Sequence, residues 1–280
     1  MPFVIGATRC SIEEGKTIIF NLRTPEARKY AFVNPSTGKI SKVINANTHF
    51  TKWILKLHYS LHAGIVGRFL VFLAGICFFL SLITGIILYR KVIFKTLLFQ
   101  TKISSKNKRN YYSSLHRYVG VWALFLNLII VFTGIFLAYK VVTSGLKKAV
   151  EPAPPTVETS VEAALKTIKK QYPDFTPTYL RLPTSPKSSI TVNGVFKGDA
   201  FYLSEYYNKV LIDYKSGDIK AVTKISEANF STKFNSSILP LHFGQYGGLF
   251  SKILYCVIGL SGPFLSITGY YIWLKRKKIA

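Results

Sequence analysis

The stretch FLVFLAGICFFLSLITGIILY, residues 69–89, has no charged side chain and is long enough to cross a hydrocarbon core about 30 Å thick as a helix. Two further uncharged runs of similar length lie at residues 119–139 and 253–274. Helices buried in a soluble core are the alternative interpretation. Three such runs in one chain favour membrane spans instead.

The distribution of charge predicts how these spans are oriented. The segment between the first two runs, residues 90–110, is densely basic, and KRKK follows the third run. Both segments are expected in the cytoplasm by the positive-inside tendency. Residues 1 to about 65 and about 141 to 248 are then expected outside, where all 12 Asp and Glu residues occur. The net charge of +25 suits anionic lipid headgroups, and no motif indicates nucleic-acid binding.

The chain also repeats itself. Three landmarks recur in the same order with nearly constant offsets of 179 and 184 residues, which predicts an internal duplication. The matches are FVNPSTGKISKV (32–43) with LIDYKSGDIKAV (211–222), LHYSLHAG (57–64) with LHFGQYGG (241–248), and Thr84-Gly85 with Thr268-Gly269.

The segment between the last two spans predicts a small α+β domain. Thr159 and Glu162 are spaced as a capping box at the start of a helix. The apolar stripe of this helix comprises Val161, Ala164, Leu165 and Ile168. Alternating residues then predict strands at 189–195, 200–214 and 219–225, with turns at Asn193-Gly194 and Ser216-Gly217.

The first half of the duplication looks shorter than the second. Its sequence predicts only the last hairpin of an outer domain, followed by the span at 69–89. The counterpart of the span at 119–139 would lie about 45 to 65 residues before Met1, if the 184-residue offset holds. We therefore expect an additional N-terminal helix to be encoded upstream.

These observations predict a helical membrane bundle, with three spans in this chain, and an outer α+β domain. The expected divisions are the end of a first outer domain (1–56), a membrane helix (57–90), a basic cytoplasmic loop (91–112), a second membrane helix (113–140), a complete outer domain (141–240), and a third membrane helix with a basic tail (241–280).

Histidines lie beside the apolar runs. His58, His62 and His242 precede spans on the outer side, and ionisable residues at such positions are often functional. Anchoring in the headgroup region is the alternative. Because His58 and His242 are related by the duplication, they are expected to face one another. Facing imidazoles can hold a haem iron from both sides, whereas the H-x-x-x-H pair of His58 and His62 could alternatively bind copper or zinc.

His62 is four residues from His58 and could replace it as the ligand, if both lie on one helix face. His116 precedes the second span at its cytoplasmic end, where its duplicate would belong to the upstream helix. A complete protein would then have one haem near each membrane face. His49 lies in a polar linker and is expected to be solvated.

Each span contains a Thr-Gly pair near one end, at Thr84-Gly85, Thr133-Gly134 and Thr268-Gly269. Glycine in a membrane helix lets a neighbouring backbone or a flat cofactor approach closely. Threonine can donate to the carbonyl one turn back. Simple helix packing is the favoured explanation of the pairs, and a cofactor contact is the alternative.

Together these motifs resemble the PepSY-associated transmembrane family. The resemblance covers nearly the whole chain and comprises Leu57-His58, Leu115-His116 with Gly120, Leu241-His242 with Gly244, the three Thr-Gly pairs, and the hairpin from Asp213 to Ile219. It implies a bacterial inner-membrane protein with outer PepSY domains and, in the family, typically four spans.

The resemblance also implies a function. Some members look like reductases containing haem b that release iron from ferric siderophores in the periplasm during iron uptake. It suggests His58, His62, His116 and His242 as candidate haem ligands. This sequence has no G-x-G-x-x-G fingerprint, so electrons are expected from a separate donor that the sequence does not identify.

Two other functions compete with electron transfer. PepSY domains also resemble inhibitory or assembly modules, so the chain could be a membrane-anchored binding module without redox activity. A transporter is a third possibility, but the predicted spans contain no Asp or Glu for a proton relay.

Overall fold

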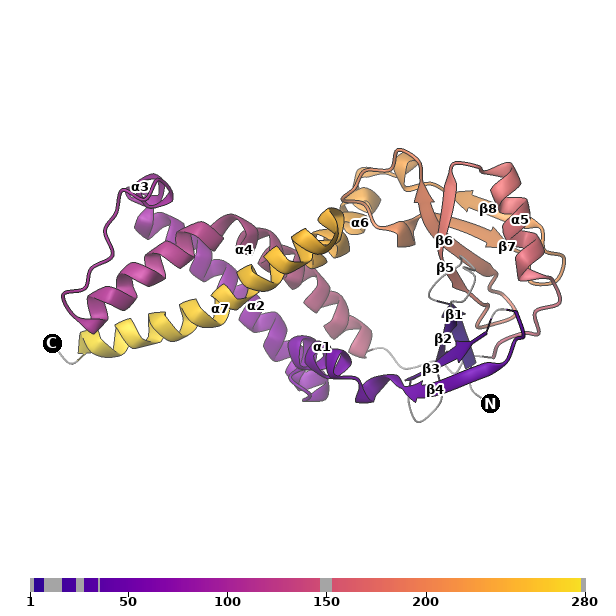
Figure 1. The fold of residues 1–280 in the computed structure, drawn as a ribbon, viewed down its shortest axis with the longest axis horizontal. Helices are drawn as coiled ribbons and strands as arrows, with labels where there is room; N and C mark the ends of the chain where they lie inside the picture. Colours follow the sequence, from indigo (N-terminus) through magenta and orange to yellow (C-terminus); the bar gives the residue numbers. More distant parts are fainter. Residues whose placement is uncertain (1–2, 8–16, 24–27, 35, 147–152, 278–280) are drawn as a thin grey trace. The chain divides into compact units, whose positions relative to one another are not determined.

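The computed structural model describes residues 3–7, 17–23, 28–34, 36–146 and 153–277 (Figure 1). The chain forms two units, each described here by itself. One contains residues 1–62 and 147–237, and the other contains residues 63–146 and 238–280. The first unit therefore unites the two segments that the charge pattern predicts to share one side of the membrane.

The described residues of the first unit form an eight-stranded antiparallel sheet with the order β4-β3-β2-β1-β5-β6-β7-β8. Its two halves are four-stranded meanders that meet through their first strands, where Ala7 pairs with Leu180. The strands are β1 (Phe3–Ala7), β2 (Ile18–Arg23), β3 (Arg28–Val33), β4 (Ile40–Asn45), β5 (Phe175–Arg181), β6 (Ile190–Phe196), β7 (Lys209–Ile212) and β8 (Ile219–Thr223).

The outermost hairpin of each half has the same turn. Asn34 Oδ1 in the β3–β4 turn accepts from the backbone N–H groups two and three residues on, and Asp213 Oδ1 does so in the β7–β8 turn. Gly38 and Gly217 close the turns with φ of 67° and 83°. Only glycine adopts this left-handed region without strain, so the geometry agrees with the predicted duplication.

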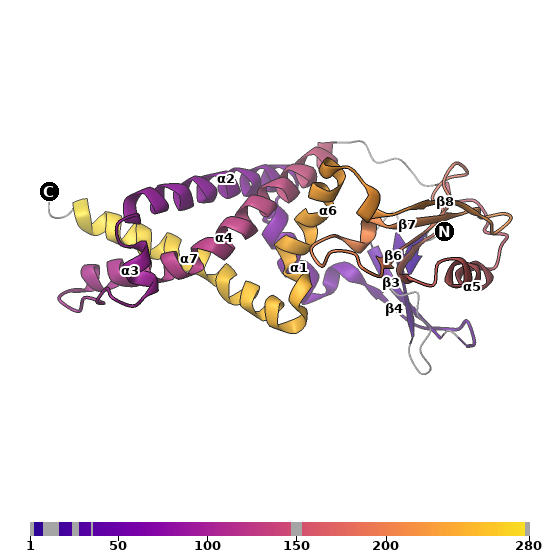
Figure 2. The ribbon, with the colours of Figure 1, turned by 90° about the horizontal axis from the view of Figure 1, so that it is seen from above.

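Helix α5 (Val161–Gln171) packs on the second half of the sheet (Figure 2). The predicted stripe is confirmed, since Ala164 and Ile168 are buried and Val161 and Leu165 pack beside them. The predicted Thr159 cap is wrong by one residue. The hydroxyl of Ser160 accepts from Ala163 N–H, because the helix begins at Val161.

Some strand predictions are wrong. The first half has four strands, not only its last hairpin: β2 pairs with its chain neighbours β1 and β3, and β1 also pairs with β5, which is remote in the chain. Asn193-Gly194 lies inside β6 and is not a turn. There the buried Asn193 amide donates to the carbonyls of Tyr206 and Asn208, so the segment before β7 is held by side-chain bonds, not strand pairing.

The second unit is a helical bundle. Helix α4 (Lys108–Leu146) packs along both α2 (Gly64–Tyr89) and α7 (Gly248–Lys277) (Figures 1 and 2). Short helix α3 (Ile93–Leu97) in the basic loop packs against α4. The three long helices are long and apolar enough to cross a membrane, which confirms the three apolar runs. With 39 residues, α4 is about 58 Å long and exceeds the hydrocarbon core.

The predicted helix starts at 57 and 241 need correction. Helix α1 (Phe50–Ser60) ends before α2, at Leu61 and His62, which have φ of 48° and 56°. Helix α6 (Phe230–Phe243) likewise ends before α7, at Gly244 with φ of 61°. Single turns of 3₁₀ helix complete the described structure: η1 (Ala46–Thr48), η2 (Glu205–Tyr207), η3 (Ile225–Glu227) and η4 (Gln245–Gly247).

This break changes the relation between two candidate ligands. His58 lies within α1, whereas His62 follows its end in a left-handed conformation. The prediction that they share one continuous helix face is therefore wrong, because the left-handed backbone at Leu61 and His62 ends the helix before His62.

Candidate functional site

Two of the predicted histidines lie in the helical unit. His116 lies in the third turn of α4, and His242 lies near the end of α6, just before α7. His58 and His62 belong to the other unit. The predicted pairing of His58 with His242 joins the two units and stays a prediction.

His116 contacts a Thr-Gly pair on α7. Its Nδ1 lies 2.8 Å from the Oγ1 of Thr268, which is 4% exposed. The Thr268 hydroxyl also lies 2.8 Å from the Phe264 carbonyl one turn back, to which it donates. A Cβ added to Gly269 would lie 3.4 Å from Cε1 of His116, so the glycine lies directly beside the imidazole edge.

His242 has the equivalent relation to a Thr-Gly pair on α4. Its Nδ1 lies 3.0 Å from the carbonyl oxygen of Ile130 and 3.2 Å from Oγ1 of Thr133. A Cβ added to Gly134 would lie only 3.0 Å from Cε1 of His242. The two contacts between these antiparallel helices are therefore reciprocal. His116 on α4 contacts the Thr-Gly pair of α7, and His242, just before α7, contacts the Thr-Gly pair of α4.

The third Thr-Gly pair has a different environment. Thr84 is exposed and donates to the Ser81 carbonyl within α2. A Cβ added to Gly85 would have no neighbouring atom within 4 Å. The predicted bond from threonine to the preceding turn is thus confirmed in all three pairs, while the contact with histidine distinguishes two of them.

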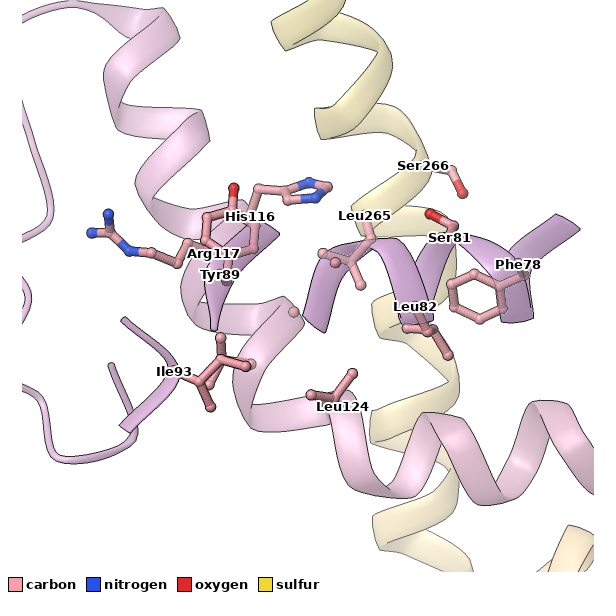
Figure 3. Close-up of a pocket in the computed structure, with 13 residues that line it drawn as sticks. Phe78, Ser81, Leu82, Tyr89, Ile93, His116, Arg117, Leu124, Leu265 and Ser266 are labelled. Atoms are coloured by element: carbon pink, nitrogen blue, oxygen red, sulfur yellow. The ribbon is translucent and has the colours of Figure 1, made fainter. Parts of the chain in front are cut away.

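Gly85 lines a cavity of about 120 Å³ between the helices, together with His116 (Figure 3). Phe78 and Leu82 of α2 and Leu265 of α7 form apolar walls. The guanidinium of Arg117 points away from the His116 imidazole (Figure 3) and donates to the Lys102 carbonyl at 3.1 Å. The cavity thus combines an apolar wall with one imidazole.

The remaining candidates lie around α1. The Nε2 of His62 is 3.1 Å from the Trp53 carbonyl oxygen, and the two rings are 5.0 Å apart. Because a carbonyl only accepts, this nitrogen carries the proton and is engaged within the same unit. His49 is exposed at the N-terminal cap position of α1, without a side-chain capping bond, as expected for a solvated linker residue.

The sequence analysis missed a polar contact between α4 and α7. The buried Asn127 amide donates to Ser261 Oγ at 2.8 Å. The contact lies between those of His116 with Thr268 and of His242 with Thr133. An amide in the middle of an apolar run was the signal that could have revealed it, since such groups need a partner in lipid.

The donor chemistry of the histidines fits a haem iron. The carbonyl of Ile130 can only accept, so Nδ1 of a neutral His242 carries the proton and Nε2 carries the lone pair that binds metals. The cavity beside His116 is smaller than the roughly 300–1,000 Å³ of pockets for drug-sized ligands. It therefore does not enclose a complete macrocycle, and a haem there would also contact the surface outside the cavity.

Comparison with known families gives one match. Residues 6–276 match the sequence model of the family described as the PepSY-associated TM region. No curated protein matches the chain significantly. The match covers both units and includes all four candidate histidines.

Proposed function

Because the chain belongs to the family of PepSY-associated transmembrane proteins, we propose that it is a haem-containing electron-transfer protein of the bacterial inner membrane. It passes electrons outward to ferric chelates such as siderophores. The observation that carries this proposal is the pair of reciprocal histidine contacts between α4 and α7. These contacts hold one imidazole at each of two separate levels of the bundle.

The spacing of these levels suits transfer across a bilayer. His242 contacts Thr133, which is 17 residues beyond His116 on α4. At 1.5 Å per residue this separation is about 26 Å, close to the thickness of the hydrocarbon core. One site then lies near each membrane face. The contact between Asn127 and Ser261 holds the helices together between them.

In this proposal His242 holds the outer haem, with His58 as its partner and His62 as the reserve. The 184-residue repeat favours His58, because it relates this residue to His242. His116 serves the inner site. When bound, haem supplies a one-electron couple. Reduction loosens a ferric chelate, because hard oxygen donors hold Fe(III) more tightly than Fe(II). The electron donor is a separate protein or small molecule.

The test is the visible spectrum of the full-length protein, purified from the membrane and supplied with haem. We expect a Soret band and sharp reduced bands typical of two imidazole ligands. Replacing His242 by Ala should remove the outer haem, whereas His49→Ala should leave the haem content unchanged. His116→Ala should affect only an inner haem.

Haem content per folded protein is the quantity to compare, with expression level and thermal stability measured alongside. A wild-type spectrum without haem would refute the electron-transfer function. An unchanged bis-imidazole spectrum in His242→Ala would refute the ligand assignment while leaving the function open to another histidine.

An exposed edge of the sheet supports a second candidate function, that of a membrane-anchored binding or assembly module. Strand β4 is an edge strand, and its Ile40 and Val43 are 63% and 47% exposed. An exposed edge with apolar side chains can accept an extended peptide as an additional strand. Under this alternative, a Lys substitution of Ile40 would abolish partner capture in a pull-down without changing any haem spectrum.

A further inference from the structure

The contacts of Thr268 together determine the role of its hydroxyl oxygen. The hydroxyl oxygen lies 2.8 Å from the Phe264 carbonyl and 3.3 Å from the Leu265 carbonyl, both in the preceding turn of α7. A carbonyl can only accept, so Thr268 is the donor there. Because the hydrogen is used, the oxygen presents a lone pair to Nδ1 of His116 at 2.8 Å.

This arrangement selects one form of the imidazole. Nδ1 must carry the proton to donate to Thr268, and in a neutral ring Nε2 then carries the lone pair. Histidines that bind metals typically donate their second nitrogen in this way to an acceptor of the protein. The Thr268 side chain is buried, so water does not compete readily for the bond.

His242 is held in the same tautomer, with hydrogen on Nδ1, by a different acceptor. Its Nδ1 faces the Ile130 carbonyl at 3.0 Å, and Thr133 Oγ1 is the more distant acceptor at 3.2 Å. The Thr133 hydroxyl lies 2.6 Å from the Ile129 carbonyl and donates there. A main-chain acceptor therefore remains at this site even when the threonine is changed.

We propose that Thr268 is the positioning residue of His116, fixing the tautomer with hydrogen on Nδ1 and presenting Nε2 to a metal-containing ligand. Gly269 lies beside this ring, since a Cβ there would be 3.4 Å from Cε1 of His116. At His242 the Ile130 carbonyl is the main acceptor that fixes the tautomer, and the Thr133 hydroxyl oxygen is a second acceptor. The metal-binding role rests on the proposed function, whereas the tautomer does not.

The experiment records ¹⁵N spectra of the full-length, haem-free protein in lipid nanodiscs with labelled histidines. A His116→Gln variant identifies the His116 signals. At a pH where the ring is neutral, wild-type His116 should show a protonated Nδ1 and an unprotonated Nε2. Thr268→Val removes the acceptor and should populate the other tautomer, whereas Thr268→Ser keeps the hydroxyl and should preserve the wild-type spectrum.

Two matched variants test the specificity. Thr84→Val changes the equivalent threonine of α2, which bonds the Ser81 carbonyl, and should leave the His116 signals in place. Thr133→Val should leave the His242 tautomer intact, because the Ile130 carbonyl remains. A wild-type His116 protonated on Nε2, or a Thr268→Val spectrum equal to wild type, would overturn the proposal.

A second measurement separates this inference from the proposed function. Titration with hemin should show roughly 10- to 100-fold weaker binding at the His116 site in Thr268→Val, as for other residues that orient metal ligands. Wild-type protein that binds no hemin would refute the haem function, and the spectra alone would then decide the tautomer. Hemin affinity unchanged in Thr268→Val would refute the positioning role.

Discussion

The side-chain amide of Asn127 donates to Ser261 Oγ across 2.8 Å between α4 and α7, and both residues are more than 90% buried. Ser261 donates in turn to the Ile258 carbonyl, which leaves its oxygen to accept. We expect a coupling energy of about 0.6 kcal/mol between the two side chains, the average measured for hydrogen bonds between membrane helices, with about 1.7 kcal/mol as the upper limit.

A double-mutant cycle with Asn127→Ala and Ser261→Ala measures this energy, using unfolding of the solubilised protein by a denaturing detergent. Ser266→Ala is the matched control, because Ser266 is exposed on the same helix and donates only to the Gly262 carbonyl in the described contacts. Strictly additive effects of the Asn127 and Ser261 substitutions would contradict the expected bond.

The duplicated hairpins provide a matched pair of glycines. Gly217→Ala should destabilise the protein more than Gly38→Ala. Both residues have positive φ, which costs a side chain about 1–2 kcal/mol, but only the Cβ at position 217 would collide with Thr159 Oγ1. Thermal unfolding of both variants measures the difference, and adding Thr159→Ala to Gly217→Ala should reduce it. Equal losses in the two single variants would refute this account.

Asp213 should contribute stability that depends on pH. Its pKa is lowered to about 2, first by the Lys220 ammonium at 2.6 Å and then by the backbone N–H groups of Lys215 and Ser216. Since the folded-state pKa lies below the ordinary value of 3.8, the contribution is present above pH 4 and is lost as pH falls toward 2.

Asp213→Asn should therefore lower the melting temperature at pH 6 and flatten its dependence on pH between 4 and 2. Asp218→Asn removes an equal charge from an exposed position in the same turn and serves as the control. If the two variants have the same pH profile, the bonds of Asp213 do not stabilise the fold.

The predicted orientation is tested by reporters inserted into the full-length chain. A reporter at Lys106 or after Lys278 should indicate the cytoplasm, and one at Lys187 should indicate the outer side, because the basic segments are retained inside. Lys106 and Lys187 are exposed, so insertion there disturbs little packing. An outer-side signal from Lys106 would reverse the proposed direction of electron transfer.

The long helices and the outer hairpins could be predicted from the sequence because their signals are local. Uncharged runs of about 20 residues mark the helices, and an Asn or Asp with a glycine four residues later marks the turn of each outer hairpin. The helix stripe ending at Ile168 could be predicted for the same reason. These patterns reflect side-chain polarity and backbone preference within a few residues.

The Thr-Gly pairs show where local information ends. The sequence predicted the bond from each threonine to its preceding turn, which forms within one helix. It did not predict that Thr268 would meet His116 while Thr84 would not, because that contact joins residues 152 positions apart. Only the antiparallel packing of α4 against α7 determines which threonine meets an imidazole.

The sequence by itself determined that this chain has three apolar helices, a duplicated hairpin and histidines next to the helices. The tertiary structure decided that β1 joins β5 and that His116 and His242 contact opposite helices. The physical reason is that apolar runs and tight turns depend on neighbouring residues. Strand pairing and hydrogen bonds between helices depend instead on distant segments, which come together only when the chain folds.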